Sequence, residues 1–141
     1  MESIAQREAA ILEDFSFFDD WMDKYEHLIA LGKELAPMTE EQKVEENQIK
    51  GCQSQVWLHA REEEGRVFFD ADADAIITRG MIALLLRPVQ GQAPADIASY
   101  EFGFLAPLGL TAHLSPTRAN GLLSMVKQIR LYGVAFQAKR G

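Results

Sequence analysis

The spacing of apolar residues changes twice along the chain, and this change constrains the fold most strongly. Between residues 18 and 29 apolar side chains recur at steps of three and four, which predicts an amphipathic helix. They are Phe18, Trp21, Met22, Tyr25, Leu28 and Ile29. A shorter helix is expected to precede it, from about Ser3 to Glu13. The stretch "QVWLHAR" instead alternates at every second residue, which is typical of a strand, and helical spacing returns after residue 74.

The alternating segments predict an antiparallel hairpin. "QVWLHAR" and "RVFFDAD" are separated by "EEEG" at 62–65, which has the composition of a turn. The residues expected on the core face are Val56, Leu58, Ala60, Val67, Phe69 and Ala71. Because two strands alone are only marginally stable, we expect a third strand, for which "VEENQIK" at 44–50 is the candidate, or helices packed on this face.

Two further helices are expected in the second half of the chain. The first lies in "DADAIITRGMIALLLR", with Asp72 or Asp74 as the candidate cap. The last begins with Ser115 as cap and Pro116 in its first position. Helices, then a small sheet, then helices predict an α+β fold, with an antiparallel sheet of about three strands flanked by N- and C-terminal helices.

Composition limits the classes of protein to consider. The chain has 141 residues, 48% of them hydrophobic, so we expect one domain spanning residues 1–141. Its 21 acidic and 14 basic residues give a net charge of −7, which argues against non-specific nucleic-acid binding. No apolar run is long enough to cross a membrane, and the N-terminus has no signal-peptide pattern. The single cysteine cannot form an internal disulfide, which fits a reducing compartment, so we expect a cytoplasmic protein.

That cysteine, Cys52, lies in the polar stretch "NQIKGCQSQVWLHA" at 47–60. Gly51 can adopt backbone angles that suit a tight loop, and Lys50 is a cation that could favour the thiolate. The neighbours that could donate hydrogen bonds to a sulfur anion are Gln53, Ser54 and Gln55. These residues favour a nucleophilic or sulfur-carrying cysteine over the buried structural cysteine that is common elsewhere, but they do not identify the reaction.

Other chemistries have weaker support in the sequence. The three histidines, His27, His59 and His113, are far apart, and there is no Cys-x-x-Cys pair, so a metal site is not expected. A cysteine-dependent hydrolase would need a histidine base, for which His59 and His113 are the candidates, although His59 is better explained as a packing residue. A non-catalytic adaptor with a structural cysteine is the other alternative.

Four segments in order resemble the SufE family, the sulfur-acceptor proteins that partner a cysteine desulfurase in iron–sulfur cluster assembly. The most specific is "IKGCQSQVW" at 49–57. The others are "WMDKYEHLIALGKELAP" at 21–37, "DADAIITRGMIALL" at 72–85 and "LTAHLSPTRANGLLSMVKQI" at 110–129. The resemblance implies an α+β fold with a three-stranded antiparallel sheet, in agreement with the periodicity.

The resemblance also implies a mechanism. Cys52 would take persulfide sulfur from a SufS-type cysteine desulfurase, stimulate that enzyme, and pass the sulfur to an iron–sulfur scaffold. Pyridoxal phosphate would belong to the desulfurase, so this chain is expected to bind no cofactor and to act as a persulfide carrier rather than as a stand-alone enzyme. A scaffold role is excluded on a single subunit, because a cluster needs several thiolates.

Two structural expectations follow from this mechanism. Since an exposed persulfide or thiolate is readily oxidised, we expect Cys52 to turn inward at rest and to swing out on docking. Arg118 matches the family's arginine, and it is either a cation near the cysteine loop or partner, or a solvated residue of the first helical turn. The family is also compatible with a homodimer.

Overall fold

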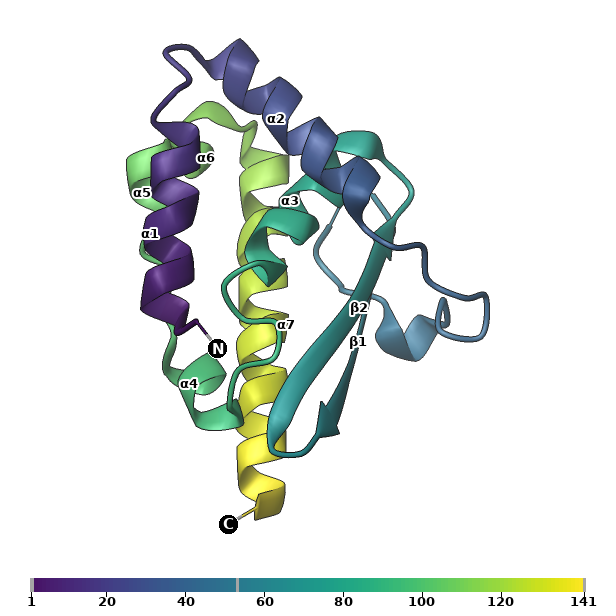
Figure 1. Cartoon of the computed structure of the whole chain (residues 1–141). Helices are drawn as coiled ribbons and strands as arrows, with labels where there is room; N and C mark the ends of the chain where they lie inside the picture. Colours follow the sequence, from purple (N-terminus) through teal and green to yellow (C-terminus); the bar gives the residue numbers. More distant parts are fainter. Residues whose placement is uncertain (1, 53, 141) are drawn as a thin grey trace.

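Seven α-helices and one β-hairpin make up the part of the chain that the computed structural model describes, residues 2–52 and 54–140, with only the backbone of Arg140 (Figure 1). The first half contains α1 (Ile4–Phe15), α2 (Trp21–Glu34), the short 3-10 helix η1 (Glu45–Asn47) and β1 (Val56–Glu63). The second half contains β2 (Arg66–Ala73), α3 (Ile76–Leu86), α4 (Pro94–Ser99), α5 (Leu105–Leu108), α6 (Leu110–His113) and α7 (Pro116–Arg140). The α+β prediction is confirmed.

Side-chain caps determine where several helices begin. Ser3 caps α1 in a reciprocal capping box with Gln6, and the Asp20 carboxylate accepts a hydrogen bond from the backbone N–H of Asp23 at the start of α2. Ser115 accepts from the backbone N–H of Arg118 at 3.3 Å, as expected for the cap of α7. These local signals explain why the N-terminal and C-terminal helices lie close to their predicted positions.

The sheet has two strands rather than about three. β1 and β2 pair antiparallel from Val56 opposite Ala73 to Glu63 opposite Arg66, and Glu64 and Gly65 form the turn with positive φ. The segment 44–50 contributes a single bridge between Gln48 and Trp57. A 3-10 turn occupies residues 45–47 and another turn begins at residue 50, so the extended backbone between them is too short for a strand.

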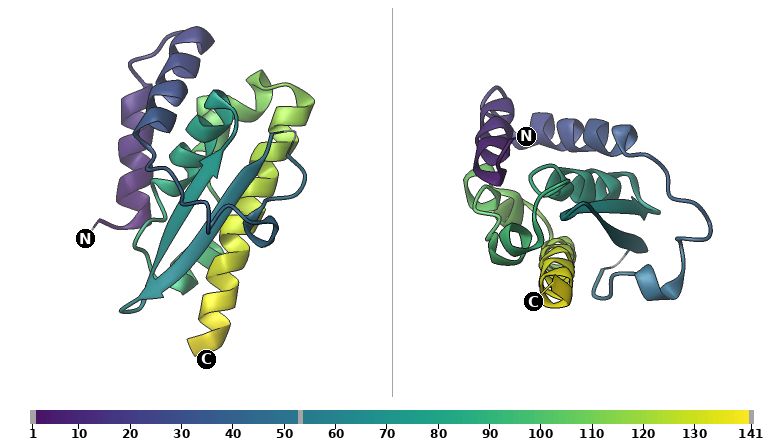
Figure 2. Two further views of the ribbon diagram at one scale, coloured as in Figure 1. Left: turned by 90° about the vertical axis from the view of Figure 1, so that its right-hand side faces the viewer. Right: turned by 60° about the horizontal axis from the view of Figure 1, so that its bottom comes forward.

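The helix α3 is the centre of the packing. It lies between α2 and α7 and against the sheet, as the two views in Figure 2 show. Its buried side chains include Ile77, Met81, Ile82, Leu84 and Leu85. The α2 and α3 backbones meet closely at two glycines: a methyl group on Gly32 would lie 2.7 Å from the backbone nitrogen of Gly80. None of the described helices combines the length and the apolar character that a membrane span requires.

Neither Asp72 nor Asp74 caps α3, contrary to the prediction. The helix begins after Ala75, without a side-chain cap. Asp72 is instead buried in β2, where it pairs with Arg79 and, at 3.1 Å, with Lys43. Burial alone would raise the pKa of the Asp72 carboxyl, but the hydrogen bond from Lys43, the backbone donors and the charge of Arg79 together lower that pKa. This cluster joins the 36–44 connector to the sheet and α3.

Candidate functional site

Cys52 lies on a short loop whose two ends are fixed by hydrogen bonds. Before the loop, the backbone N–H of Ile49 donates to the carbonyl of Val56 at 2.8 Å. After it, the backbone N–H of Gln55 donates to the carboxylate of Asp74 at 3.0 Å. The loop between these two points is therefore attached to the start of β1 and to the end of β2.

Gly51 is required by two independent features of this loop. Its φ of +91° lies in the region that residues with a side chain rarely adopt. In addition, a methyl group at this position would lie 2.6 Å from Ser124 Oγ on α7. The glycine therefore allows the backbone to turn and also to approach α7, which brings the next residue, Cys52, onto the surface of that helix.

The thiol of Cys52 contacts the backbone of α7. Its Sγ lies 3.6 Å from the carbonyl oxygen of Gly121, a geometry in which the protonated thiol donates a weak hydrogen bond. Gly121 faces the sulfur directly: a methyl group there would lie 3.5 Å from Sγ, an ordinary van der Waals distance. The side chain is half-buried, and burial raises the pKa of the Cys52 thiol. The resting group is thus a neutral thiol that faces inward.

A small cavity of about 70 Å³ opens beside the sulfur. It is formed by the cysteine loop, the start of α3 and the first turns of α7. Its lining consists of Cys52, Ser54, Ala75, Ile77, Thr78, Met81, Thr117, Arg118, Gly121 and Met125. Ile77, Met81 and Met125 are buried, whereas Thr117 and Arg118 are exposed, so the cavity has an apolar interior and a polar, cationic opening.

Arg118, and not Lys50, is the cation that the structure places at this cavity. Lys50 is exposed and pairs with Glu45 at 3.7 Å, and it lines a separate hollow against α7. The pKa of Cys52 responds to burial alone, and it moves opposite to the shift expected from a neighbouring cation. In the resting loop Lys50 therefore lies beside Glu45 and the separate hollow, whereas Arg118 lines the cavity beside Cys52.

The polar loop neighbours have different positions. Ser54 lines the cavity, and its hydroxyl accepts a hydrogen bond from Thr78 Oγ1 at 3.3 Å. Gln55 is exposed, and its backbone N–H is used in the bond to Asp74. Gln53, the third predicted neighbour, lies outside the described residues. Ser54 is thus the predicted hydroxyl that the structure places in the cavity.

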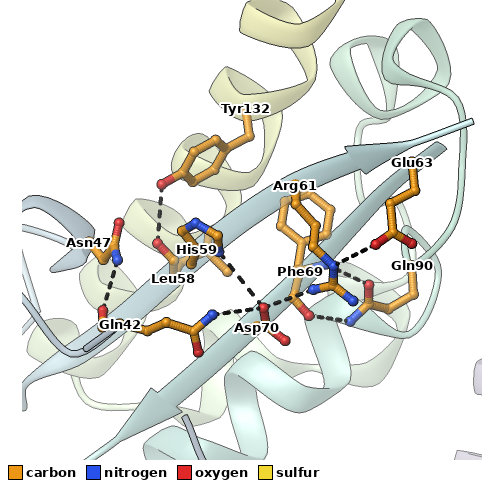
Figure 3. A network of polar contacts seen from close by, with 10 residues as sticks. All are labelled: Gln42, Asn47, Leu58, His59, Arg61, Glu63, Phe69, Asp70, Gln90 and Tyr132. Carbon is orange, nitrogen blue, oxygen red and sulfur yellow. Dashed lines mark hydrogen bonds and ion pairs between the residues drawn. The ribbon is translucent and has the colours of Figure 1, made fainter. Parts of the chain in front are cut away.

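Neither candidate histidine base lines the cavity. His59 faces away from the core on β1, where its Nδ1 lies 3.7 Å from Asp70, within a network that also contains Gln42 and Arg61 (Figure 3). His113 stacks on Trp21 with ring centroids 4.9 Å apart. Over residues 2–52 and 54–140 no group of three or more potential metal ligands comes together either. The geometry gives no support to a cysteine hydrolase.

Apart from Arg118, the residues of α3 and α7 that complete the site were not identified as site residues from the sequence. Gly121 carried the one usable signal: glycine inside a helix costs stability, so its presence often marks a close approach by another group. Thr78 and Met125 gave no comparable signal, because each fits an ordinary helical packing position. They reach the cavity only through the tertiary fold.

Together these features define a class: a small α+β domain that presents one inward-facing cysteine from a glycine loop, between two helices. Comparison with known sequences then gives the family. The family described as "SufE: Fe-S metabolism associated domain" matches residues 9–132, and the chain belongs to this family. Its membership places the protein in iron–sulfur metabolism.

Relatives agree with this family assignment, and a solved structure agrees with the fold. An uncharacterized SufE-like protein of Rhizobium etli is 42% identical over 125 residues, covering 85% of this chain and 84% of the relative. Another from Synechocystis sp. is 38% identical over 129 residues, covering 92% and 81%. The solution structure of a hypothetical protein from Thermus thermophilus superposes with a TM-score of 0.72 at 22% identity, covering 92% and 94% of the two chains. This last similarity concerns the fold alone.

Proposed function

We propose that the protein is a sulfur acceptor that receives persulfide sulfur on Cys52 from a SufS-type, pyridoxal-phosphate-dependent cysteine desulfurase. It stimulates that enzyme and passes the sulfur to an iron–sulfur cluster scaffold. The observation that carries this proposal is the position of Cys52: a half-buried thiol on a glycine loop, beside a small cavity. Pyridoxal phosphate stays on the desulfurase in this scheme, and this chain is a carrier with no turnover of its own.

The proposed transfer is a displacement at sulfur. The Cys52 thiol first leaves the Gly121 carbonyl and loses its proton to solvent, giving the thiolate. The thiolate attacks the terminal sulfur of the desulfurase persulfide, a new S–S bond forms, and the old S–S bond breaks. The desulfurase cysteine departs as a thiolate and takes up a proton. One sulfur atom moves between the proteins, with no external oxidant or reductant.

The cavity has a role after transfer. A site holds a water molecule when it offers about 10–15 Å³ of accessible space, so about 70 Å³ leaves room for one additional sulfur atom beside Cys52. The buried Ile77, Met81 and Met125 would keep that atom away from oxidants, and Arg118 at the opening would stabilise a persulfide anion. In this scheme, the inward loop protects the persulfide and the outward loop exchanges it.

The proposal is tested by stimulation of the desulfurase and by transfer of radiosulfur. Cys52→Ser keeps the size and shape of the side chain but removes the nucleophile. We expect radiosulfur from labelled cysteine to move to the native chain in a reductant-sensitive form, and the serine variant to remain unlabelled. Equal labelling of both chains would refute the role of Cys52. Full stimulation by the unlabelled Cys52→Ser variant would support a non-catalytic adaptor instead.

A further inference from the structure

The outward side of α7 presents apolar side chains to solvent. Leu123, Leu131 and Val134 are 52%, 47% and 49% exposed, although the opposite side of the same helix buries Leu122 and Ile129 completely. Positions 123, 127, 131 and 134 follow one another at steps of four and three, so they lie on one face of the helix. We call Leu123, Lys127, Arg130, Leu131 and Val134 the α7 outer face.

Charge on this helix differs from charge in the rest of the protein. Residues 116–140 include five basic residues and none of the 21 acidic ones, although the whole chain has a net charge of −7. Lys127 and Arg130 are exposed, and across the described part of the chain neither has a carboxylate partner within ion-pair distance. Arg130 donates instead to the backbone carbonyl of Ala98 at 3.4 Å. The α7 outer face is therefore a basic and apolar strip on an acidic protein.

Two hollows extend this strip across the surface. One, of about 400 Å³, lies between α7 and Ala98 of α4, and the other, of about 260 Å³, lies between α7 and residues 49–50. Lys127 and Leu131 line both of them. Ser124, which lines the second hollow, is also the residue whose Oγ approaches Gly51. The α7 outer face is thus continuous with the loop that carries Cys52.

We propose that the α7 outer face is a docking surface for the desulfurase that loads Cys52. The matching surface would place apolar side chains over Leu123, Leu131 and Val134, and Asp or Glu carboxylates opposite Lys127 and Arg130. This inference rests on the proposed sulfur-acceptor function. A second copy of the chain fits this face less well, because a two-fold contact would bring the same basic residues together.

The position of the strip beside the cysteine loop favours the sulfur donor as its occupant. The resting thiol is protonated and in contact with Gly121, so the loop must move before Cys52 can attack. A protein bound over Lys127 and Leu131 also covers the hollow that Lys50 and Ser124 line. Binding there can therefore displace the loop at its glycine and turn Cys52 toward the bound donor.

The test compares binding of the desulfurase from the same organism to the full chain and to three variants. Lys127→Glu/Arg130→Glu reverses both charges, and Leu123→Ser/Leu131→Ser removes two exposed apolar side chains. Lys33→Glu is the charge-reversal control. Lys33 is exposed on α2, which α3 separates from α7 (Figure 2). Dissociation constants are measured by isothermal titration calorimetry at low and high salt, with thermal unfolding and light scattering to check fold and oligomeric state.

We expect each double variant to raise the dissociation constant about tenfold or more, with no effect of Lys33→Glu. Added salt should weaken the native complex and have less effect on the charge-reversed one. Native affinity in both double variants would overturn the proposal. The proposal would also be overturned if the double variants changed only the self-association of the chain. It would be overturned too if they loaded Cys52 normally but no longer delivered sulfur to a scaffold, because the face would then belong to the recipient. If the native chain took no sulfur at all, the proposed function itself would fail, whatever the binding data.

Discussion

Replacement of Gly51 by alanine tests two features of the loop that carries Cys52: its turn at a positive φ and its contact with α7. Two costs add in Gly51→Ala. Alanine at a φ of +91° is strained by about 1–2 kcal/mol. Its methyl group would also lie 2.6 Å from Ser124 Oγ, so the hydroxyl must rotate away from the Asn120 carbonyl, which it contacts at 3.0 Å. Loss of that hydrogen bond costs about 1 kcal/mol, so the free energy of unfolding should fall by about 2–3 kcal/mol.

A double-mutant cycle with Ser124 separates these two costs. In the Ser124→Ala background the hydroxyl is absent, and the remaining contact of the new methyl group, 3.5 Å to the Ser124 Cβ position, is an ordinary one. Gly51→Ala should then cost only the backbone strain, so the cycle should give a coupling energy of about 1 kcal/mol. Gly103→Ala is the matched control, because its methyl group would lie 3.7 Å from Glu8 Oε1 and its φ is not in the left-handed region.

Urea unfolding measures the stability, and the rate of Cys52 alkylation by iodoacetamide measures how often the loop leaves its inward position. We expect faster alkylation in Gly51→Ala, because a strained loop leaves its inward position more often, and an unchanged rate in Gly103→Ala. If Gly51→Ala lowered the free energy of unfolding by less than about 0.5 kcal/mol, the strained turn would be contradicted. Additivity of Gly51→Ala with Ser124→Ala would contradict the contact between the loop and α7.

Three further predictions concern charge and the loop. The pKa of Asp72 is lowered in the folded protein, so its contribution to stability is complete above the unfolded value of about 3.9 and disappears as the pH falls through the folded value. Asp72→Asn should therefore cost about 3 kcal/mol in urea unfolding at pH 7 and clearly less at pH 3, whereas an equal cost at both would contradict the ion cluster. Burial raises the pKa of the Cys52 thiol, so alkylation of the folded chain should reach its half-maximal rate at a higher pH than in the urea-unfolded chain; an equal or lower midpoint would contradict the buried resting thiol. Asp74→Ala removes the acceptor for the Gln55 N–H, so alkylation of Cys52 should become about fivefold faster, and an unchanged rate would show that this bond does not restrain the loop.

The elements that the sequence predicts well are those that local signals determine. The 18–29 spacing, the alternation on both sides of the turn, and the Ser115–Pro116 pair each predict a helix or strand that the structure contains, although α2 begins at Trp21 rather than at Phe18. The third strand expected at 44–50 was wrong because the 3-10 turn in this segment leaves only one bridge to β1. Local composition does not specify where a backbone turns away from its neighbour.

The site shows the same limit more clearly. Cys52 and Gly51 were recognisable because their chemistry is unusual for their positions. Gly121, by contrast, is 69 residues from Cys52 in the sequence and meets it only through the packing of α7. The candidate cap at Asp72 or Asp74 was wrong for a related reason: each carboxylate has another partner, Arg79 or the Gln55 N–H, that becomes adjacent only in the folded chain.

The central claim, that Cys52 accepts sulfur, is tested most directly by the mass of the intact protein. The native chain and Cys52→Ser are incubated with an active cysteine desulfurase and cysteine, separated from it, and measured by mass spectrometry before and after reduction. The proposed function predicts that the native chain gains the mass of one sulfur atom, that the fragment containing Cys52 carries it, and that reductant removes it. A native chain without added sulfur, or a gain that persists in Cys52→Ser, would contradict the proposal.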